Sequence, residues 1–314
     1  MTAVIDLRSD FCAPPTDEMW QAMRSAGEGS VAKLELTVAF ELGKEAAVLC
    51  PSCTAANLAA LLALGQRGRT AIVEANAHVL VAEGGGITEL ARLLPLSLAT
   101  AGGPLSADEV EAAVVTREAA VVCLENTHTR AGGTVRDGAA TAALAAAAHK
   151  HGATVHLDGA RLPNAAAALA VDIAELSTPV DTVAVSLNKG LCAPYGAMLA
   201  GDTETIADAR EHLHRLGGGT VHKDWLLAAA GLVAWEQMRS RLVEDHQRAR
   251  RLAELLRLPV PETNIVLTEL PAAALPELEQ RGVLAFAPGC GNVRLVTHRG
   301  ISDDDVERAA AAIS

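Results

Sequence analysis

Short apolar runs alternate with Ala- and Leu-rich segments of helical spacing over the first two thirds of the chain. The runs that predict strands are Ala47–Cys50, Ala71–Glu74, Ala119–Leu124, Thr154–Leu157, Thr182–Leu187 and Ala197–Ala200. The segments that predict helices include Thr54–Leu64, Ala107–Val115, Gly138–His149 and Ile206–Leu216. Apolar strands separated by helices are typical of a mostly parallel sheet with helices on both faces. We therefore expect an α/β fold.

The pattern changes after the three glycines at 217–219. A long helical stretch from Trp225 to Leu256 precedes strand-like Asn264–Leu267, a helix near Pro276–Gln280, strand-like Val293–Val296 and a last helix after Ser302. This order predicts a smaller C-terminal α+β domain. We expect residues 1–220, with the N-terminal segment, to form the large domain and residues 221–314 the small one. The long helix would join them.

One uncharged segment, residues 46–66, is long enough to cross a bilayer. Pro51 lies inside it and would break a helix at that point, and Ser52 and Asn57 add polar groups. We therefore expect a buried strand, a turn and a helix here, and no membrane partner.

Composition limits the partners of the chain. It has 314 residues, with 26 Lys and Arg against 38 Asp and Glu, for a formal charge of −12. A nucleic-acid or membrane-headgroup surface needs a surplus of Lys and Arg, so neither is expected, although a local pocket for a small anion stays open. Asp6, Arg8 and Asp10 argue against a signal peptide. Six cysteines are too few for a disulfide scaffold, so we expect a reducing, cytoplasmic compartment.

Polar residues stand at the ends of three predicted elements, where α/β sheets place their sites. His156–Arg161 follows a strand with an acid and a guanidinium, Lys189 lies soon after another strand, and Pro51–Thr54 is a turn that suits a phosphate. Each piece alone is typical of a structural ion pair or a solvated strand end. Together they suggest pyridoxal phosphate, which needs a lysine for its Schiff base and an acid beside its ring nitrogen.

Several short motifs occur in order along the chain. They are Asp6–Asp10, Glu125–His128, His156–Arg161, Leu187–Leu191 with Ala193–Pro194, Leu216–Gly219, Thr263–Val266 and Arg294–His298. With this ordered set the sequence resembles, nearly end to end, the threonine aldolase group of the fold-type I pyridoxal-phosphate enzymes, also called the β-eliminating lyase family. The resemblance implies the fold-type I, transferase-like architecture.

For the cofactor, the resemblance implies that Lys189 is the Schiff-base lysine and that Asp158 pairs with the pyridine nitrogen. His78, which precedes Glu83-Gly-Gly85, matches the imidazole that stacks on the cofactor. In the phosphate turn, Ser52 and Thr54 match the family, and Cys53 lies between them. The implied cofactor-binding residues are Lys189, Asp158, His78, Ser52, Cys53, Thr54 and Arg161.

For the substrate, Arg161 and Arg294, with Ser9, match the positions that hold the α-carboxylate. Bidentate arginine suits that planar anion. His128 matches the family's second histidine, near the substrate hydroxyl. Because imidazole titrates near neutrality, either histidine can help to remove the β-hydroxyl proton. The implied catalytic residues are Lys189, His78, His128 and Asp158.

The resemblance implies cleavage of the Cα–Cβ bond of a β-hydroxy-α-amino acid, threonine or allo-threonine by default, to glycine and an aldehyde. It also implies a homodimer or homotetramer. Departures from the family pattern keep two alternatives open. One is a pyridoxal-phosphate-dependent racemase, transaldolase or β-elimination enzyme for another amino acid. The other is a non-catalytic relative that acts as a structural or regulatory partner.

The departures lie in segments that line the site in relatives. Cys53 stands at the usual glycine of the phosphate turn, Asn188 replaces the serine before the lysine, and the family's tyrosine is missing around residues 29–33. Cys50 and Cys53 form a lone C-x-x-C. Since no second pair lies at zinc-site spacing, no metal site is expected.

Overall fold

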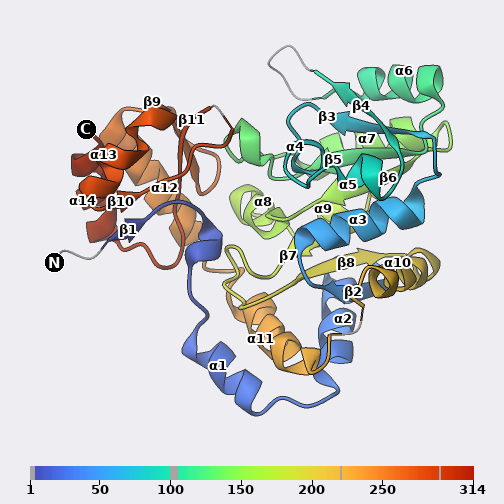
Figure 1. The fold of residues 1–314 in the computed structure, drawn as a ribbon, viewed down its shortest axis with the longest axis horizontal. Helices are drawn as coiled ribbons and strands as arrows, with labels where there is room; N and C mark the ends of the chain where they lie inside the picture. The colour runs from blue at the N-terminus through green and yellow to red at the C-terminus, as the bar shows by residue number, and fades with distance from the viewer. Residues whose placement is uncertain (1–3, 100–104, 220, 290) are drawn as a thin grey trace.

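The computed structural model describes residues 4–99, 105–219, 221–289 and 291–314 (Figure 1). Its central sheet has seven strands in the order β2-β8-β7-β6-β5-β3-β4. The strands are β2 (Ala46–Cys50), β3 (Thr70–Glu74), β4 (Leu94–Leu98), β5 (Val121–Glu125), β6 (Thr154–Asp158), β7 (Thr182–Ser186) and β8 (Ala197–Gly201). β8 runs antiparallel to both neighbours, and the other pairs are parallel. The predicted mostly parallel sheet is confirmed.

Helices cover both faces of this sheet (Figure 1). The first face packs against α1 (Asp17–Arg24), α2 (Ser30–Glu41), α6 (Ala107–Arg117), α7 (Gly138–His149), α8 (Leu162–Leu169), α9 (Ile173–Ser177) and α11 (Asp224–Gln237). The second face packs against α3 (Cys53–Leu64), α4 (His78–Val81), α5 (Gly86–Glu89) and α10 (Thr203–Arg215). Because both faces are covered, the strands carry apolar residues on both sides.

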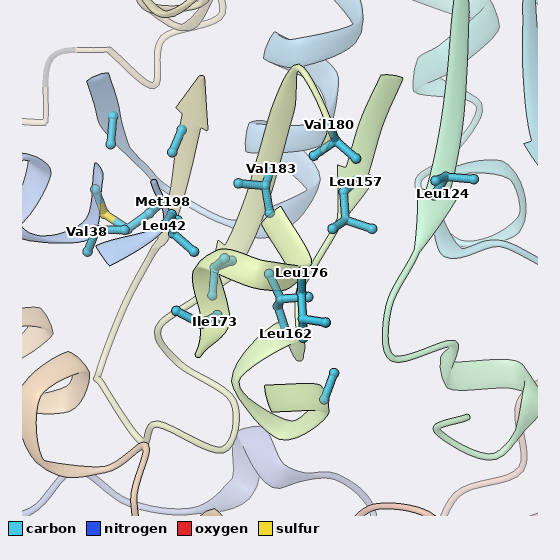
Figure 2. Close-up of a cluster of buried hydrophobic side chains, with 14 of the residues drawn as sticks. Val38, Leu42, Leu124, Leu157, Leu162, Ile173, Leu176, Val180, Val183 and Met198 are labelled. Carbon is cyan, nitrogen blue, oxygen red and sulfur yellow. The ribbon is translucent and has the colours of Figure 1, made fainter. Parts of the chain in front are cut away.

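Alternate strand residues fill the core on the first face. Leu124, Leu157 and Val183 come from three adjacent strands and pack with apolar residues of α8 and α9 (Figure 2). Cys123 and Ala184, their neighbours in the chain, belong to clusters on the opposite face. This is the two-residue period of a strand. The close packing holds the ends of β5, β6 and β7 in fixed relative positions.

A second hydrophobic cluster holds the C-terminal part together. Its elements are β1 (Ile5–Asp6), α12 (Leu242–Leu256), β9 (Ile265–Pro271), α13 (Leu275–Gln280), β10 (Val283–Leu284), β11 (Asn292–Val296) and α14 (Asp303–Ile313). Ile5 and Leu7 pack in this cluster, and β1 pairs in parallel with β10. Trp235 of α11 packs in the core of the large sheet instead. Ile5 and Leu7 thus pack with C-terminal elements and Trp235 packs with the sheet, while the division into domains of residues 1–220 and 221–314 stays a prediction.

Each predicted strand of the sheet occurs, with bounds shifted by no more than two residues. Two segments differ. The predicted long helix is broken between α11 and α12, where the Nε of Arg239 donates to the carbonyl of Trp235 at 2.8 Å. The edge strand β4 was not predicted, because Pro95 interrupts its short apolar run.

Local capping explains where several helices begin. Ser52 caps α3 by accepting a hydrogen bond from the backbone N of Ala55 at 3.1 Å, so the segment 46–66 is a strand, a turn and a helix, as predicted. Ser302 and Asp305 form a capping box at the start of α14. Within the described residues, no helix has both the length and the apolar character that a membrane crossing requires.

Candidate active site

Charged side chains gather at the carboxyl edge of the parallel strands. Glu74, Glu125 and Asp158 are the last residues of β3, β5 and β6, and Lys189 follows the end of β7. Parallel strands end at the same edge of a sheet, and open α/β sheets bind their ligands there. The predicted lysine and acid therefore come from neighbouring strands at the expected edge.

Asp158 is buried and held by several donors. Its Oδ2 accepts a hydrogen bond from the Nδ2 of Asn57 at 3.0 Å, and its Oδ1 accepts one from the backbone N of Ala160 at 3.1 Å. The Sγ of Cys53 lies 3.8 Å from the same Oδ1. These contacts fix the orientation of the carboxylate at the end of β6.

The amide of Asn57 links two carboxylates and a histidine. Its Nδ2 also donates to the Oε1 of Glu83 at 2.9 Å, and its Oδ1 lies 3.0 Å from the Nε2 of His156. The Nδ1 of His156 lies 2.9 Å from the Oγ1 of Thr182. Burial lowers the pKa of His156 to about 4, so this imidazole is uncharged at neutral pH.

His78 extends the same network. Its Nδ1 lies 2.9 Å from the Oε1 of Glu83, and this hydrogen bond raises the pKa of His78 although burial opposes the shift. Burial raises the pKa of Glu83, and the negative charge of Asp158 adds to that rise. The imidazole is 36% exposed, whereas the Glu83 side chain is 4% exposed. One side of His78 is therefore held by the protein, and the ring remains accessible.

Glu125 connects the two segments that carry the predicted histidines. Its Oε2 accepts from the backbone N of His78 at 2.7 Å, and its Oε1 accepts from the backbone N of Thr129 at 2.9 Å. Burial raises the pKa of Glu125. The Nδ1 of His128 accepts from the backbone N of Ala131 at 3.3 Å, so a neutral His128 carries its proton on Nε2.

The ligand atoms of His78, Glu83 and Asp158 lie within 4.8 Å of one another, an arrangement that can hold a metal ion. In this group, however, Asn57 directs its two N–H bonds at the two carboxylates. A cation between the carboxylates would face the positive ends of those bonds. The geometry favours a hydrogen-bonded network at this point.

The predicted phosphate turn lies at the start of α3. Ser52 is the N-cap, and Cys53 and Thr54 open the first turn. Backbone N–H groups in a first turn have no partner within the helix and suit an anion. The side chain of Cys53 contacts Asp158, so it lies toward the acid. Burial raises the pKa of the Cys53 thiol well above its usual range, which keeps the thiol protonated.

Lys189 is a cation at this edge, where Arg136 is already paired with Glu74. Lys189 is half-buried, and its charge contributes, after that of Arg161, to the lowered pKa of Asp10 and opposes the rises in the pKa values of His78 and Cys53. Its Nζ makes no hydrogen bond or ion pair with another of the described residues. An amine without a protein partner is available to bond to a carbonyl carbon.

Asp10 and Arg161 form a buried ion pair. The Nε and Nη2 of Arg161 donate to the two carboxylate oxygens of Asp10 at 2.8 and 2.7 Å, and Nη1 donates to the Oγ1 of Thr129 at 3.1 Å. Ser9 donates its hydroxyl to Asp10 at 3.2 Å. Burial alone would raise the pKa of Asp10, but the charge and hydrogen bonds of Arg161 lower it well below its usual range. One N–H bond each on Nη1 and Nη2 remains for a substrate, so this role of Arg161 stays a prediction.

Arg294 is a buried guanidinium without an anionic partner in the part of the chain that the structure describes. It lies 5.5 Å from the ring centroid of Phe286, and its Nη2 donates to the carbonyl of Arg8 at 3.3 Å. Its Nε is buried without a hydrogen-bond partner. Burial, and then the charge of Arg161, lower the pKa of Arg294 to about 10. Since a buried unpaired charge is unfavourable, a ligand carboxylate would be stabilised here.

The predicted residues thus form two connected groups. The first contains the residues predicted for the cofactor at the carboxyl edge, except Arg161, which was predicted for both cofactor and substrate and belongs to the second group with Ser9 and Arg294. Their charges act on one another, because Asp158 influences the pKa of Arg161 and Lys189 that of Asp10. Asn57, Glu83, Glu125 and Asp10 were not predicted to have a role in the site. Three of these stand in quoted motifs, and Asn57 is a lone amide in an uncharged segment, where burial requires partners.

Solved structures share this architecture. The threonine aldolase from Leishmania major superposes with a TM-score of 0.85 at 19% identity, over 98% of both chains. A serine palmitoyltransferase from Sphingomonas wittichii does so with a TM-score of 0.77 at 17% identity, over 98% of this chain and 86% of that one. The sheet, with its acid and lysine at the carboxyl edge, has the fold of the fold-type I pyridoxal-phosphate enzymes.

Sequence comparison identifies the family. A family model described as "Beta-eliminating lyase" matches residues 6–270. The low specificity L-threonine aldolase of Escherichia coli K12 is 34% identical over 98% of both chains. The low-specificity L-threonine aldolase 1 of Arabidopsis thaliana is 33% identical over 96% of this chain and 93% of its own. The chain belongs to the beta-eliminating lyase family, so it is a lyase.

Proposed function

We propose that this lyase uses pyridoxal phosphate to cleave the Cα–Cβ bond of a β-hydroxy-α-amino acid of the threonine or allo-threonine type, giving glycine and an aldehyde. The names of the relatives support this substrate class. The observation that carries the proposal is the buried Arg294, whose Nε lacks a partner among the described residues. An α-carboxylate is the planar anion that a guanidinium binds best.

The side chains at the carboxyl edge fit the cofactor. Asp158 offers a buried carboxylate for the ring nitrogen, Lys189 offers an amine without a protein partner, and His78 offers an accessible imidazole face. Ser52 and Thr54, with the first turn of α3, would hold the phosphate. An acid, an amine and an anion site are the donor set that this cofactor requires.

When bound, pyridoxal phosphate supplies an electron sink for the electron pair left on Cα as the Cα–Cβ bond breaks. The protein sets the geometry of that step. Asp158 would hold the ring nitrogen, and its negative charge would favour the protonated form of that nitrogen. Arg294 would bind the substrate carboxylate and so restrict how the bonds to Cα are oriented in the site.

His78 is better placed than His128 to accept the β-hydroxyl proton. Its Nδ1 contacts Glu83, which leaves Nε2 as the acceptor, whereas a neutral His128 holds its proton on Nε2. As the hydroxyl proton moves to His78, the C–O bond becomes the C=O bond of the aldehyde and the Cα–Cβ bond breaks. Cα then takes a proton and becomes the methylene carbon of glycine, so the step needs no oxidant or reductant.

An absorbance spectrum of the purified protein with pyridoxal phosphate tests the cofactor. We expect the band of the lysine-bound cofactor in the natural protein and in Lys150→Ala, whose side chain lies in an exposed ion pair with Glu111. Lys189→Ala should lose the band. A band that persists in Lys189→Ala would contradict the role of that lysine.

Release of glycine and aldehyde from L-threonine, L-allo-threonine and phenylserine tests the reaction. We expect cleavage of at least one of these substrates. An intact cofactor spectrum without cleavage would favour the racemase, transaldolase or β-elimination alternative. A colourless protein that pyridoxal phosphate cannot reconstitute would favour the non-catalytic alternative.

We also propose that the chain forms a homodimer or homotetramer in the cytoplasm. Leu36 and Phe40, one turn apart on α2, are 71% and 84% exposed, and such an apolar face suits a second copy. Light scattering should give a multiple of the chain mass, and this multiple should fall in Phe40→Asp. A monomeric natural protein would contradict the oligomer.

The proposed compartment is a reducing one. It is supported by the free cysteines, which are Cys12, Cys50, Cys53, Cys123 and Cys192.

A further inference from the structure

The side-chain amide of Asn57 lies between two histidines that belong to different parts of the site. Asn57 is fully buried on α3. On one side its Oδ1 lies 3.0 Å from the Nε2 of His156, and on the other its Nδ2 lies 2.9 Å from the Oε1 of Glu83. The same Oε1 contacts the Nδ1 of His78 at 2.9 Å. One amide is thus connected to both imidazoles.

Only one orientation of this amide satisfies its neighbours. Nitrogen and oxygen of an asparagine side chain are distinguished by their partners. With Nδ2 toward Asp158 and Glu83, both N–H bonds end on carboxylate oxygens, at 3.0 and 2.9 Å. A flipped amide would turn its oxygen toward the carboxylates, and acceptors would then meet without a hydrogen between them. The two carboxylates therefore determine the orientation.

This orientation decides where both histidines carry their protons. The Oδ1 of Asn57 can only accept, so His156 must present a proton on Nε2, and its Nδ1 then accepts from the hydroxyl of Thr182. The ionised Glu83 also can only accept, so His78 presents a proton on Nδ1. We propose that Asn57 is a positioning residue that sets these two proton positions and thereby leaves the Nε2 of His78 free to accept the substrate proton.

Charged groups face His78 from several elements. Glu83 follows α4, Asp158 ends β6 and Lys189 follows β7, while Glu125 of β5 accepts the backbone N–H of His78. The acids favour the protonated imidazole, and Lys189 disfavours it. In the neutral ring, the contact with Glu83 distinguishes the two nitrogens, and Asn57 acts on His78 through the N–H bond that it donates to the same oxygen of Glu83. The use of Nε2 as a base rests on the proposed function, whereas the two proton positions do not.

A second buried pair of the same residue types provides a matched control. The Oδ1 of Asn164 on α8 lies 3.0 Å from the Nε2 of His246 on α12. Burial lowers the pKa of His246 to about 4, as it does for His156. Among the described residues, the amide nitrogen of Asn164 donates to no carboxylate. The control therefore keeps the Asn–His contact and lacks the link to Glu83.

Nitrogen NMR of the full-length protein, labelled with 15N in histidine, measures the proton positions directly. Spectra are recorded with and without pyridoxal phosphate, and His78→Gln and His156→Gln assign the signals. We expect a neutral His156 with its proton on Nε2, and a His78 that carries its proton on Nδ1 once it is neutral. A proton on Nε2 of neutral His78, or on Nδ1 of His156, would overturn the proposal whether or not the protein cleaves threonine.

Asn57→Asp sharpens the test, because it keeps an oxygen for His156 and removes both N–H bonds. We expect neutral His78 to become a mixture of the form protonated on Nδ1 and the form protonated on Nε2. We also expect kcat for the proposed cleavage to fall about ten- to hundredfold, as for other residues that orient a reacting group. Asn164→Asp should leave the Nδ1 proton of neutral His78 in place, because Asn164 contacts His246 and has no hydrogen bond to Glu83 or His78 among the described residues. An unchanged Nδ1 proton on His78 in Asn57→Asp would overturn the role of Asn57. If that variant does not fold, the spectrum of the natural protein still decides.

Discussion

We call the end of the site that would hold the cofactor ring the ring end. It contains Asp158, Asn57, Glu83 and His78. Here each carboxylate accepts hydrogen bonds from protein donors, and Asn57 and His78 each have a protein partner. The contacts join α3, β6 and the segment after α4. The ring end is therefore a closed network whose orientation does not depend on a ligand.

We call the other end of the site the carboxylate end. It contains Asp10, Arg161 and Arg294. Asp10 and Arg161 satisfy each other, but Arg294 lacks an anion among the described residues. The difference has a physical reason. A tightly held cofactor needs preorganised charges, whereas a substrate that comes and goes is bound where the protein leaves a charge for it to complete. Substitution of a paired group should therefore mainly change stability, and substitution of the unpaired Arg294 should mainly change substrate binding.

Asp10→Asn should have the largest effect, and it should act on stability. The substitution leaves the buried guanidinium of Arg161 without a full counter-charge, and breaking a buried pair costs about 3–5 kcal/mol. Asp6→Asn is the matched control, since Asp6 pairs with Arg8, whose side chain is 50% exposed, and such pairs contribute about 0–1 kcal/mol. Urea unfolding measures both. Equal losses in the two variants would contradict the distinction between buried and exposed pairs.

The same ion pair predicts how stability depends on pH. The pKa of Asp10 is lower in the folded protein than in the unfolded chain, where it is near about 3.9. Its contribution is therefore present above that value and is lost as pH falls toward the folded pKa. We expect the unfolding free energy to fall below about pH 4, and to fall less steeply in Asp10→Asn. Urea unfolding at several pH values measures the slopes, and identical slopes would exclude Asp10 as a source.

The carboxyl edge could be predicted from the sequence because its residues are local signals. Lys189 and Asp158 follow apolar runs that end at the same side of the sheet, so the strand pattern alone brings them together. The partners of these residues could not be predicted in this way. Asn57 and Asp158 are 101 positions apart, and Asp10 and Arg161 are 151 apart. Hydrophobic periodicity shows which face is buried, but not which buried polar groups meet across the core.

The fold shows the same division between local and long-range information. The strands of the sheet other than the edge strand β4 were predicted because both of their faces are apolar. The break between α11 and α12 was not, because it depends on Arg239, which binds the carbonyl of Trp235 and pairs with the distant Glu41. Nothing in the sequence indicated that the N-terminal strand β1 has a partner near the C-terminus. Its pairing with β10 is a contact across nearly the whole chain.

Arg294→Lys should have an intermediate effect, confined to substrate binding. Lysine keeps a charge but loses the planar fork that binds a carboxylate, so kcat/KM should fall about ten- to hundredfold, mainly through KM. The cofactor spectrum should not change, since Arg294 belongs to the carboxylate end. Arg299→Lys is the control, because Arg299 is exposed and donates to the carbonyl of Pro14. An unchanged KM in Arg294→Lys would contradict the assignment of the unpaired guanidinium.

Cys53→Gly should have the smallest effect. The thiol contacts Asp158 at 3.8 Å, and because burial raises the pKa of this thiol, it remains a neutral, weak donor. Asp158 keeps its stronger donors, Asn57 and the backbone of Ala160. We therefore expect the Kd for pyridoxal phosphate to change by less than about fivefold, which corresponds to about 1 kcal/mol. A spectroscopic titration measures it, with Cys12→Ser as the control. A tenfold gain in affinity would show that Cys53 crowds the phosphate turn, and the ring end would then be less complete than its hydrogen bonds indicate.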